Sequence, residues 1–246
     1  RILPGAVLRE AVENDRILGG ITPDCAARAR DLYARFATGA LHLADSRTAE
    51  AAKLAENAFR DVNIAFANEL AGICRAAGVD PMAAIALANR HPRVDILRPG
   101  VGVGGHCIPV DPWFLAEAAG SEATRLIRAA RAVNDARPAE VAARLRAMAA
   151  ALGDAPVACL GLAYKPEVDD LRNSPALAVV EALSRDATLD VLVADPFCAW
   201  LPAELAARRH VRLVTAEAAL AQAGLVGLLV PHAAFDALRP ALAAKP

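Results

Sequence analysis

The 246 residues are enough to bury one large core or two of ordinary size. With 27 basic and 28 acidic residues the net charge is −1, so no basic surplus exists to neutralise a nucleic-acid backbone. Much of the 56% hydrophobic fraction is alanine, and the most apolar stretch, residues 223–231, is too short to cross a bilayer. Composition therefore excludes nucleic acid and the membrane as expected partners.

The cysteines form an odd, scattered set of five without a CxxC pair. They are Cys25, Cys74, Cys107, Cys159 and Cys198. This pattern argues against a disulfide framework and a metal site, and it is typical of a reducing cytoplasm. The sequence opens without Met or an apolar leader, so we expect no signal peptide and a beginning in mid-domain.

Residues 1–45 have the pattern of strand, helix, strand. Residues 16–20 form the first apolar run, and a helix is expected from Pro23 to about Ala37 because Thr22-Pro23 is a typical helix start. Residues 41–44 are the second expected strand. The segment predicts the edge of an α/β domain.

A long helix is expected over residues 48–77, with Asp45 or Ser46 as its cap and Gly78 as its stop. One face is polar and the other apolar. The polar residues are Lys53, Asn57, Arg60, Asp61 and Asn68, and the apolar ones are Leu54, Val62, Phe66, Leu70 and Ile73. About 30 residues at 1.5 Å each span about 45 Å, which presents more apolar surface than one small domain covers. We therefore expect a homodimer built on Phe59, Val62, Phe66 and Leu70 of this helix.

A shorter helix over residues 81–89 precedes a glycine-rich loop that reaches Pro112. Two further helices should follow, separated near Pro138, because proline interrupts the hydrogen-bond ladder of a helix.

From residue 154 the pattern changes to short apolar runs that alternate with helical segments. The expected strands are residues 157–164, 189–193, 211–214 and 225–230, and Ser174-Pro175 caps the first helix between them. Such alternation predicts a parallel, doubly wound sheet. The predicted domains are 1–45, 46–152 and 153–246, in an overall α/β chain.

The loop 100–114 contains several glycines but is no dinucleotide fingerprint. That motif must follow a strand and open a helix, whereas this loop is preceded by Pro99 and followed by Pro109 and Pro112. Its glycines are expected to let the backbone approach another ligand closely. Cys107 lies within it, with Asp111 four residues on, and is either a buried thiol or a nucleophile.

Three motifs carry a resemblance to a known family. Gly104-Gly-His-Cys-Ile-Pro-Val-Asp111 resembles the catalytic-cysteine signature of the UDP-glucose/GDP-mannose dehydrogenase family. The helix 51–69 resembles the family's central dimerisation helix, and residues 157–175 resemble the start of its UDP-binding domain. Within the family, residues 59–63, 88–94 and 111–114 are most similar to the enzymes that oxidise UDP-N-acetyl-D-mannosamine.

The resemblance implies the remnant of a Rossmann NAD-binding domain, a central all-helical dimerisation region and a C-terminal Rossmann-like UDP-binding domain. The family's GxGxxG, its final strand and helix, and an acidic sugar-site residue before Arg1 are absent from the sequence. The implied activity is NAD-dependent oxidation of the sugar C6 alcohol to a carboxylate, for surface polysaccharide synthesis.

Site roles are implied by the same resemblance. Cys107 would trap the intermediate aldehyde as a thiohemiacetal that becomes a thioester, while Lys53 and Asn57 hold the oxyanion and water and Asp111 assists proton transfer. The residues implied in substrate binding are Arg93, Leu97, Gly104, Gly105, Tyr164 and Lys165, with Arg93 crossing the dimer. Arg172 would reach the NAD pyrophosphate.

Two alternatives stay open. The chain could be a non-catalytic module that dimerises and binds UDP-sugar, or its substrate could be UDP-N-acetylglucosamine or UDP-glucose. Because no GxGxxG is suitably placed, we expect the chain by itself to bind UDP-sugar weakly and NAD⁺ negligibly.

Overall fold

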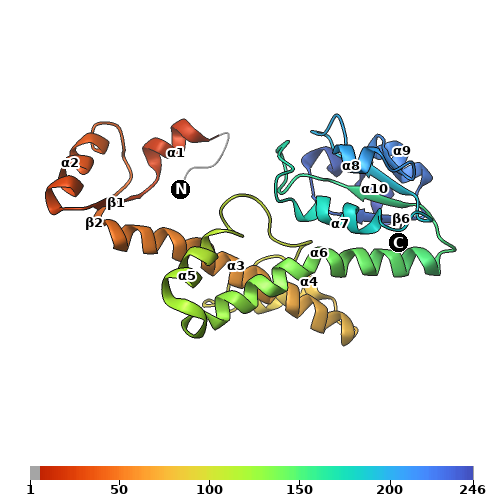
Figure 1. Ribbon diagram of the computed structural model, residues 1–246, viewed down its shortest axis with the longest axis horizontal. Helices are drawn as coiled ribbons and strands as arrows, with labels where there is room; N and C mark the ends of the chain where they lie inside the picture. Colours follow the sequence, from red (N-terminus) through yellow and green to blue (C-terminus); the bar gives the residue numbers. More distant parts are fainter. Residues whose placement is uncertain (1–5, 246) are drawn as a thin grey trace. The chain divides into compact units, whose positions relative to one another are not determined.

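The computed structural model describes residues 6–245. The chain falls into two compact units, one ending at Asn57 and the other beginning at Ala58. Each unit is described by itself (Figure 1).

The first unit contains a two-stranded parallel sheet and two helices. Its elements are α1 (Val7–Glu13), β1 (Arg16–Gly20), α2 (Pro23–Tyr33) and β2 (Leu41–Asp45). The predicted strand, helix and strand are all present, and the Thr22 side chain accepts a hydrogen bond from the Cys25 N–H at 3.2 Å as the helix cap. Leu18 and Ala26 are the buried apolar residues described in this unit.

Helix α2 ends at Tyr33, four residues before the predicted end. The chain turns there because Thr38 must return to α1, where its N–H donates to the Val12 carbonyl at 2.7 Å. Gly39 packs so tightly in this turn that a β-carbon would lie 2.4 Å from the Asn14 backbone. A tertiary contact thus ends the helix earlier than local propensity predicts.

Helix α3 (Ser46–Ala76) is the predicted long helix. The Asp45 carboxylate caps its start by accepting the Thr48 N–H at 3.0 Å, and Gly78, with φ of +70°, follows its end. Both signals were readable in the sequence.

The second unit begins with helices. After α3 come α4 (Pro81–Ala88), α5 (Asp111–Ala123), which kinks at Gly120, and α6 (Arg125–Ala151). Among residues 6–245, no helix has the length and apolar composition needed to cross a membrane.

The predicted break at Pro138 is wrong, because α6 runs through this residue. A proline inside a helix removes one hydrogen bond and costs about 3 kcal/mol. Burial of α6 residues before and after Pro138 offsets that free-energy cost. Ala130 and Asn134 are buried before it, and Ala142 and Leu145 after it.

A four-stranded parallel sheet completes the second unit. Its strands are β3 (Val157–Leu160), β4 (Val191–Ala194), β5 (Val211–Leu213) and β6 (Leu225–Leu228), in the order β5-β4-β3-β6. The helices between and after them are α7 (Pro175–Leu183), α8 (Ala203–Ala206), α9 (Ala216–Gln222), the 3₁₀ helix η1 (Ala233–Leu238) and α10 (Arg239–Ala243). The parallel, doubly wound prediction is confirmed.

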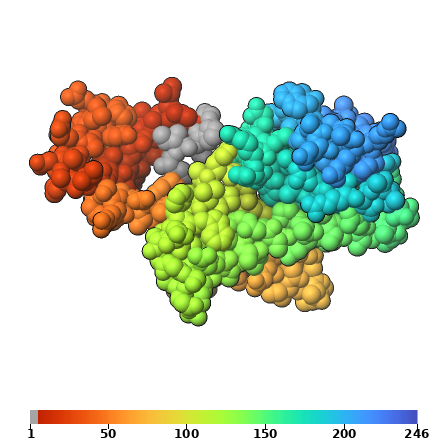
Figure 2. Space-filling view, viewed as in Figure 1, coloured from red at the N-terminus to blue at the C-terminus, as the bar shows by residue number. Residues whose placement is uncertain are grey.

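Each face of this sheet has its own core. One face packs against α6 and α7 through Leu145, Val179 and Leu183, and the other packs against α9 and η1 through Leu220 and Phe235. In the space-filling view the blue surface of the sheet domain lies directly on the green surface of α6 (Figure 2).

Strand β3 ends four residues before its predicted end at Tyr164. Gly161 turns the chain with φ of +90°, and a β-carbon there would lie 2.5 Å from Val230. Residues 161–174 therefore form a long turn that follows the carboxyl end of β3. This turn carries several of the candidate site residues.

Candidate functional site

Cys107 is exposed in the loop that joins α4 to α5. Its carbonyl accepts the Val110 N–H at 3.0 Å and the Asp111 N–H at 2.8 Å, which closes one turn immediately before α5. Asp111 is the first residue of α5. The thiol is thus fixed to the start of a helix and open to a reactant, so the buried-thiol alternative does not hold for this residue.

Three asparagines hold the loop that leads to Cys107. Asn63 of α3 accepts the Leu97 N–H at 2.9 Å and donates to the Asp95 carbonyl at 2.7 Å. Asn68 of α3 accepts the Gly100 N–H at 2.8 Å. Asn89 accepts the Ile96 N–H at 2.8 Å and donates to its carbonyl at 2.9 Å. The partners of these asparagines are backbone groups, which a sequence motif does not reveal, so their role is visible only in the structure.

Below the asparagines lies a buried polar network between α3 and α6. Arg131 donates to Asp61 at 2.6 Å, and Asn134 donates to the same carboxylate at 2.9 Å and accepts from Asn68 at 3.2 Å. Burial raises the pKa of Asp61, while the Arg131 guanidinium and the Asn134 amide oppose that shift. The network connects to the loop because Asn68 also binds Gly100.

The loop glycines allow another segment of the same chain to approach their backbone closely. A β-carbon on Gly102 would lie 2.9 Å from Pro175, and one on Gly104 would lie 2.6 Å from the Asn173 carbonyl. A β-carbon on Gly105, where φ is +90°, would lie 2.8 Å from the Tyr164 ring. The missing side chains of these three glycines therefore make room for the turn 161–174. A close approach of a ligand to the loop backbone stays a prediction.

The turn 161–174 meets the cysteine loop through Tyr164 and His106, whose rings lie edge to face at 6.0 Å between centroids. The Lys165 ammonium lies 5.6 Å from the centroid of the Tyr164 ring. Asn173 donates to the Gly105 carbonyl at 3.5 Å. The structure therefore brings the Tyr164 side chain against Gly104 and Gly105 of the loop that carries Cys107, with Lys165 over the Tyr164 ring.

Arg172 forms a two-pronged ion pair with Asp170, at 3.0 and 2.8 Å. The Arg172 side chain and N–H, aided by His106 at 3.7 Å, lower the pKa of Asp170 to about 2. Arg172 remains largely exposed, so its guanidinium is open to solvent while paired.

Lys53 and Asn57 lie one turn apart on the part of α3 that belongs to the first unit. Lys53 lines a cavity of about 280 Å³ with Asp15, Arg16 and Glu56 among its neighbours, and Asn57 is buried. Among residues 6–245, no group of three His, Cys, Asp or Glu side chains is arranged to hold a metal ion.

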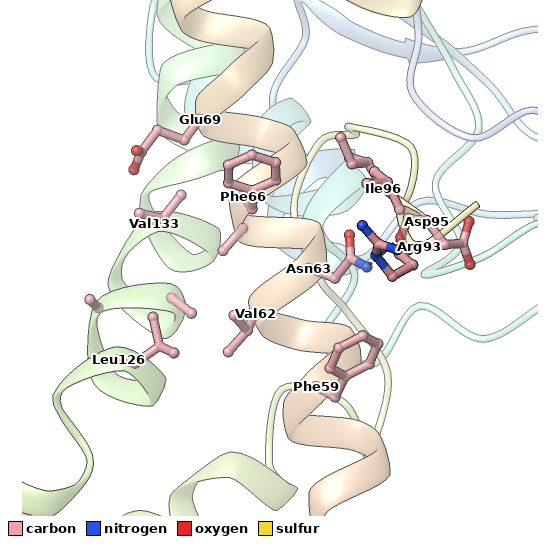
Figure 3. A pocket seen from close by; sticks show the side chains of 14 residues that line it. Phe59, Val62, Asn63, Phe66, Glu69, Arg93, Asp95, Ile96, Leu126 and Val133 are labelled. Carbon is pink, nitrogen blue, oxygen red and sulfur yellow. Dashed lines mark hydrogen bonds between the residues drawn. The ribbon is translucent and has the colours of Figure 1, made fainter. Parts of the chain in front are cut away.

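A groove of about 490 Å³ runs along the junction of α3 and α6 in the second unit. The groove is lined by Phe59, Val62 and Phe66 of α3 and by Leu126 and Val133 of α6. Figure 3 shows Val62 on the side of α3 that faces Leu126, and Phe59 on the side that faces Arg93. Arg93 and Asp95 form its polar rim (Figure 3). Phe59 is 69% exposed and Phe66 53% exposed, so this groove, which we call the α3 groove, presents large apolar side chains to solvent.

Fold and site together define a protein in which a helical region presents a cysteine loop to a Rossmann-like sheet of the nucleotide-binding type. Residues 47–136 match the model of the UDP-glucose/GDP-mannose dehydrogenase family, central domain, and residues 158–245 match that of its UDP binding domain. The chain belongs to the UDP-glucose/GDP-mannose dehydrogenase family, as its motifs predicted.

Named relatives agree with this assignment. The chain is 53% identical to an NDP-N-acetyl-D-galactosaminuronic acid dehydrogenase of Ralstonia nicotianae, over 97% of this chain and 55% of the relative. It is 48% identical to a UDP-N-acetyl-D-mannosamine dehydrogenase of Campylobacter jejuni, over 96% and 58%. The solved UDP-N-acetyl-mannosamine dehydrogenase Cap5O from S. aureus is 40% identical, with a TM-score of 0.83 over 96% of this chain and 54% of that one. The chain thus spans a little over half the length of these relatives.

Proposed function

We propose that the chain is the cysteine-bearing and sugar-nucleotide-binding part of an NAD-dependent UDP-sugar 6-dehydrogenase. The observation that carries the proposal is the exposed Cys107 in a loop packed against the turn of Tyr164 and Lys165. The proposed substrate is UDP-N-acetyl-D-mannosamine, and the proposed product is its C6 carboxylate.

No glycine-rich turn of the dinucleotide type occurs between a strand and a helix in residues 6–245, so the described residues do not fit NAD⁺ as a bound cofactor. In the proposed enzyme NAD⁺ is the acceptor of two hydrides, and it would be held by the part of the relatives that this chain does not cover.

Cys107 acts at the aldehyde level of the substrate. Its thiolate adds to the C6 carbonyl carbon, which forms a C–S bond and leaves an oxyanion that is protonated to a thiohemiacetal. Loss of a proton and a hydride gives a thioester, and water then cleaves the C–S bond, releasing the carboxylate and the thiol. Lys53 and Asn57 are the proposed partners of the oxyanion and the water, and Asp111 the proposed proton acceptor, on the strength of the family motif.

The sugar nucleotide is proposed to lie along the loop from Leu97 to Gly105, with Tyr164 and Lys165 above it. A lysine ammonium favours the diphosphate by simple charge attraction. Arg172 is proposed to contact the pyrophosphate of NAD⁺ in the complete enzyme, since its guanidinium is largely exposed.

A homodimer through the α3 groove is also proposed. Its support is the row of exposed Phe59 and Phe66 beside Leu126, which is 68% exposed. Contiguous exposed apolar surface of this kind is typical of protein interfaces. Arg93, at the rim, would then reach the partner's substrate.

The test places this chain behind a complete dinucleotide-binding domain and supplies NAD⁺ with UDP-N-acetyl-D-mannosamine. Two NADH formed per carboxylate released would support the proposal. UDP-N-acetylgalactosamine, UDP-N-acetylglucosamine and UDP-glucose are tested in parallel. A clear preference for one of them would identify that sugar nucleotide as the substrate, and the proposed reaction would still stand. Sugar-nucleotide binding without any NADH would instead support a non-catalytic binding module.

A further inference from the structure

The turn that carries Tyr164 and Lys165 lies at the carboxyl edge of the sheet, after β3. In the strand order β5-β4-β3-β6 the chain first moves to one side of β3 and then crosses to the other. Ligands of open α/β sheets bind at such a reversal point. What holds the turn in place there therefore affects the ligand.

Asp195, directly after β4, holds the beginning of the turn. Its Oδ2 accepts the Leu162 N–H at 2.7 Å and the Ala163 N–H at 3.3 Å, and its Oδ1 accepts the Phe197 N–H at 2.8 Å. Its carboxylate is completely buried. In dinucleotide-binding sheets an acidic residue after the second strand binds a ribose. Here the corresponding carboxylate binds the protein's own backbone instead.

His232, after β6, holds the end of the turn. It is 1% exposed and packs between the rings of Phe197 and Phe235. Its Nδ1 accepts the Glu167 N–H at 3.1 Å, so the proton of the neutral ring lies on Nε2. Nε2 lies 3.2 Å from Asp195 Oδ2, without the alignment of a regular hydrogen bond. A buried imidazole and a buried carboxylate thus face each other behind the turn.

Glu167 completes the connection. Its Oε1 accepts the Ala233 N–H at 2.7 Å, while its own N–H binds His232. Its backbone has φ of +62°, a conformation that non-glycine residues rarely adopt. The paired hydrogen bonds to the segment after β6 maintain this conformation.

The two attachments enclose residues 164–166. Within this segment the Tyr164 ring meets Gly105 of the cysteine loop, and the Lys165 ammonium lies 5.6 Å from the centroid of that ring. We propose that His232, Asp195 and Glu167 are positioning residues that preorganise Tyr164 and Lys165 for the sugar nucleotide. The inference rests on the proposed function in one respect, because that function assigns Lys165 to the ligand. Preorganisation matters here since ordering a loop upon binding reduces affinity.

The positioning role is tested first without ligand, by amide hydrogen exchange on the 246-residue chain. His232→Phe keeps an aromatic ring but removes both nitrogens, and we expect the amides of residues 162–167 to exchange about tenfold faster or more. His232→Asn, which keeps an acceptor at the δ position, should restore much of the protection at Glu167. His210→Phe is the matched control, because His210 binds the Ser184 carbonyl at 3.0 Å in the same domain but away from the turn. Unchanged exchange in His232→Phe would overturn the positioning role of His232.

Glu167→Ala provides a second variant that does not disturb the buried core, since the Glu167 side chain is 54% exposed. It should accelerate exchange at residues 164–167 while leaving β3 and β4 protected. If neither His232→Phe nor Glu167→Ala changes the turn, the three residues are only structural neighbours of the site.

The ligand is then added as UDP-N-acetyl-D-mannosamine, titrated by calorimetry. We expect the affinity of Glu167→Ala and His232→Phe to fall by about tenfold, with His210→Phe close to the unmodified chain. Equal affinity in all four proteins would overturn the link from the turn to the ligand. Absence of binding by the unmodified chain would instead contradict the proposed function, while the exchange data would still decide the positioning role.

Discussion

Gly105 touches the ring of Tyr164 at the point where a side chain would not fit, since a β-carbon on Gly105 would lie 2.8 Å from Cε2 of the ring. Gly105 belongs to the loop of Cys107, and Tyr164 to the turn after β3. The direction in which the cysteine loop leaves this contact is therefore set by the sheet domain.

The first prediction concerns Gly105→Ala. The new methyl group meets the Tyr164 ring, and the backbone keeps φ of +90°, which L side chains rarely adopt. We expect a loss of about 1–3 kcal/mol in the free energy of unfolding, measured with urea. Gly100→Ala is the control, because no atom lies within 4 Å of a β-carbon at Gly100. A Gly105→Ala variant as stable as Gly100→Ala would contradict the tight contact.

The second prediction concerns Cys107→Ser, made in a polypeptide that carries this chain behind a complete dinucleotide-binding domain. Binding of the sugar nucleotide should stay nearly unchanged, because the thiol acts only once an aldehyde exists. A serine hydroxyl is far less ionised than a thiol, so carboxylate formation should fall by about three orders of magnitude or more. Mass spectrometry of the products separates aldehyde from carboxylate. Near-normal carboxylate production would remove Cys107 as the nucleophile.

The third prediction concerns the α3 groove. Phe66→Glu introduces a charge beside Phe59 and Leu126, so it should convert the proposed dimer to a monomer in sedimentation experiments. Trp200→Glu alters a side chain that is 75% exposed in the sheet domain, and it should leave the dimer intact. A monomer from the unmodified chain at high concentration would argue against this interface.

The fourth prediction orders the cysteines by reactivity. Hydrogen bonds from Thr22 lower the pKa of the exposed Cys25, and Cys107 is also exposed. Burial raises the pKa of Cys159 to about 12 and that of Cys198 to about 11. Iodoacetamide at about pH 7.5 should therefore label Cys25 and Cys107 first, and Cys159 only after unfolding. Peptide mass spectrometry identifies the sites, and Cys25→Ser should leave Cys107 as the first to react. Early labelling of Cys159 in the folded chain would be inconsistent with its buried position.

The fifth prediction concerns pH and the Asp170–Arg172 pair. The pKa of Asp170 is lowered from 3.8 to about 2 in the folded chain. The pair therefore stabilises the folded chain fully at pH values above 3.8, the pKa of Asp170 in the unfolded chain, and this stabilisation is lost as pH falls toward 2. Carbon-detected NMR titration of Asp170 should show this low pKa. Arg172→Met should return it toward 3.8, and His106→Gln should move it less, because the Arg172 hydrogen bonds are the larger cause. An ordinary pKa in the unmodified chain would show that the pair does not persist in solution.

Local signals were enough to predict much of the fold. Pro23, Asp45, Gly78 and Ser174 each mark a helix end through short-range geometry, and each stands at a helix end in the structure. Where the predictions differ, a distant partner is responsible. Helix α6 passes through Pro138 because it is buried on both sides.

The polar face of α3 illustrates the same limit at the site. The sequence identified Asp61 and Asn68 as polar neighbours on one face, but not that this face is buried against α6. Their partners, Arg131 and Asn134, lie more than sixty residues further along the chain. The sequence motifs indicated Cys107 and Lys165 as candidate site residues, but they did not indicate His232. The position of His232 after β6, opposite Asp195 after β4, could have indicated it, because carboxyl ends of parallel strands share one edge.

Helix α6 is shared by the two halves of the second unit. Its first half is joined to α3 through Arg131 and Asn134, and its second half covers one face of the sheet through Leu145 and Ala149. Domains joined by a flexible linker melt one after the other, whereas domains that share a rigid element lose structure together. Calorimetry of the second unit should accordingly give one transition. A chain cut within α6 would leave an apolar surface uncovered on each piece, so neither half of this unit would be a stable protein by itself.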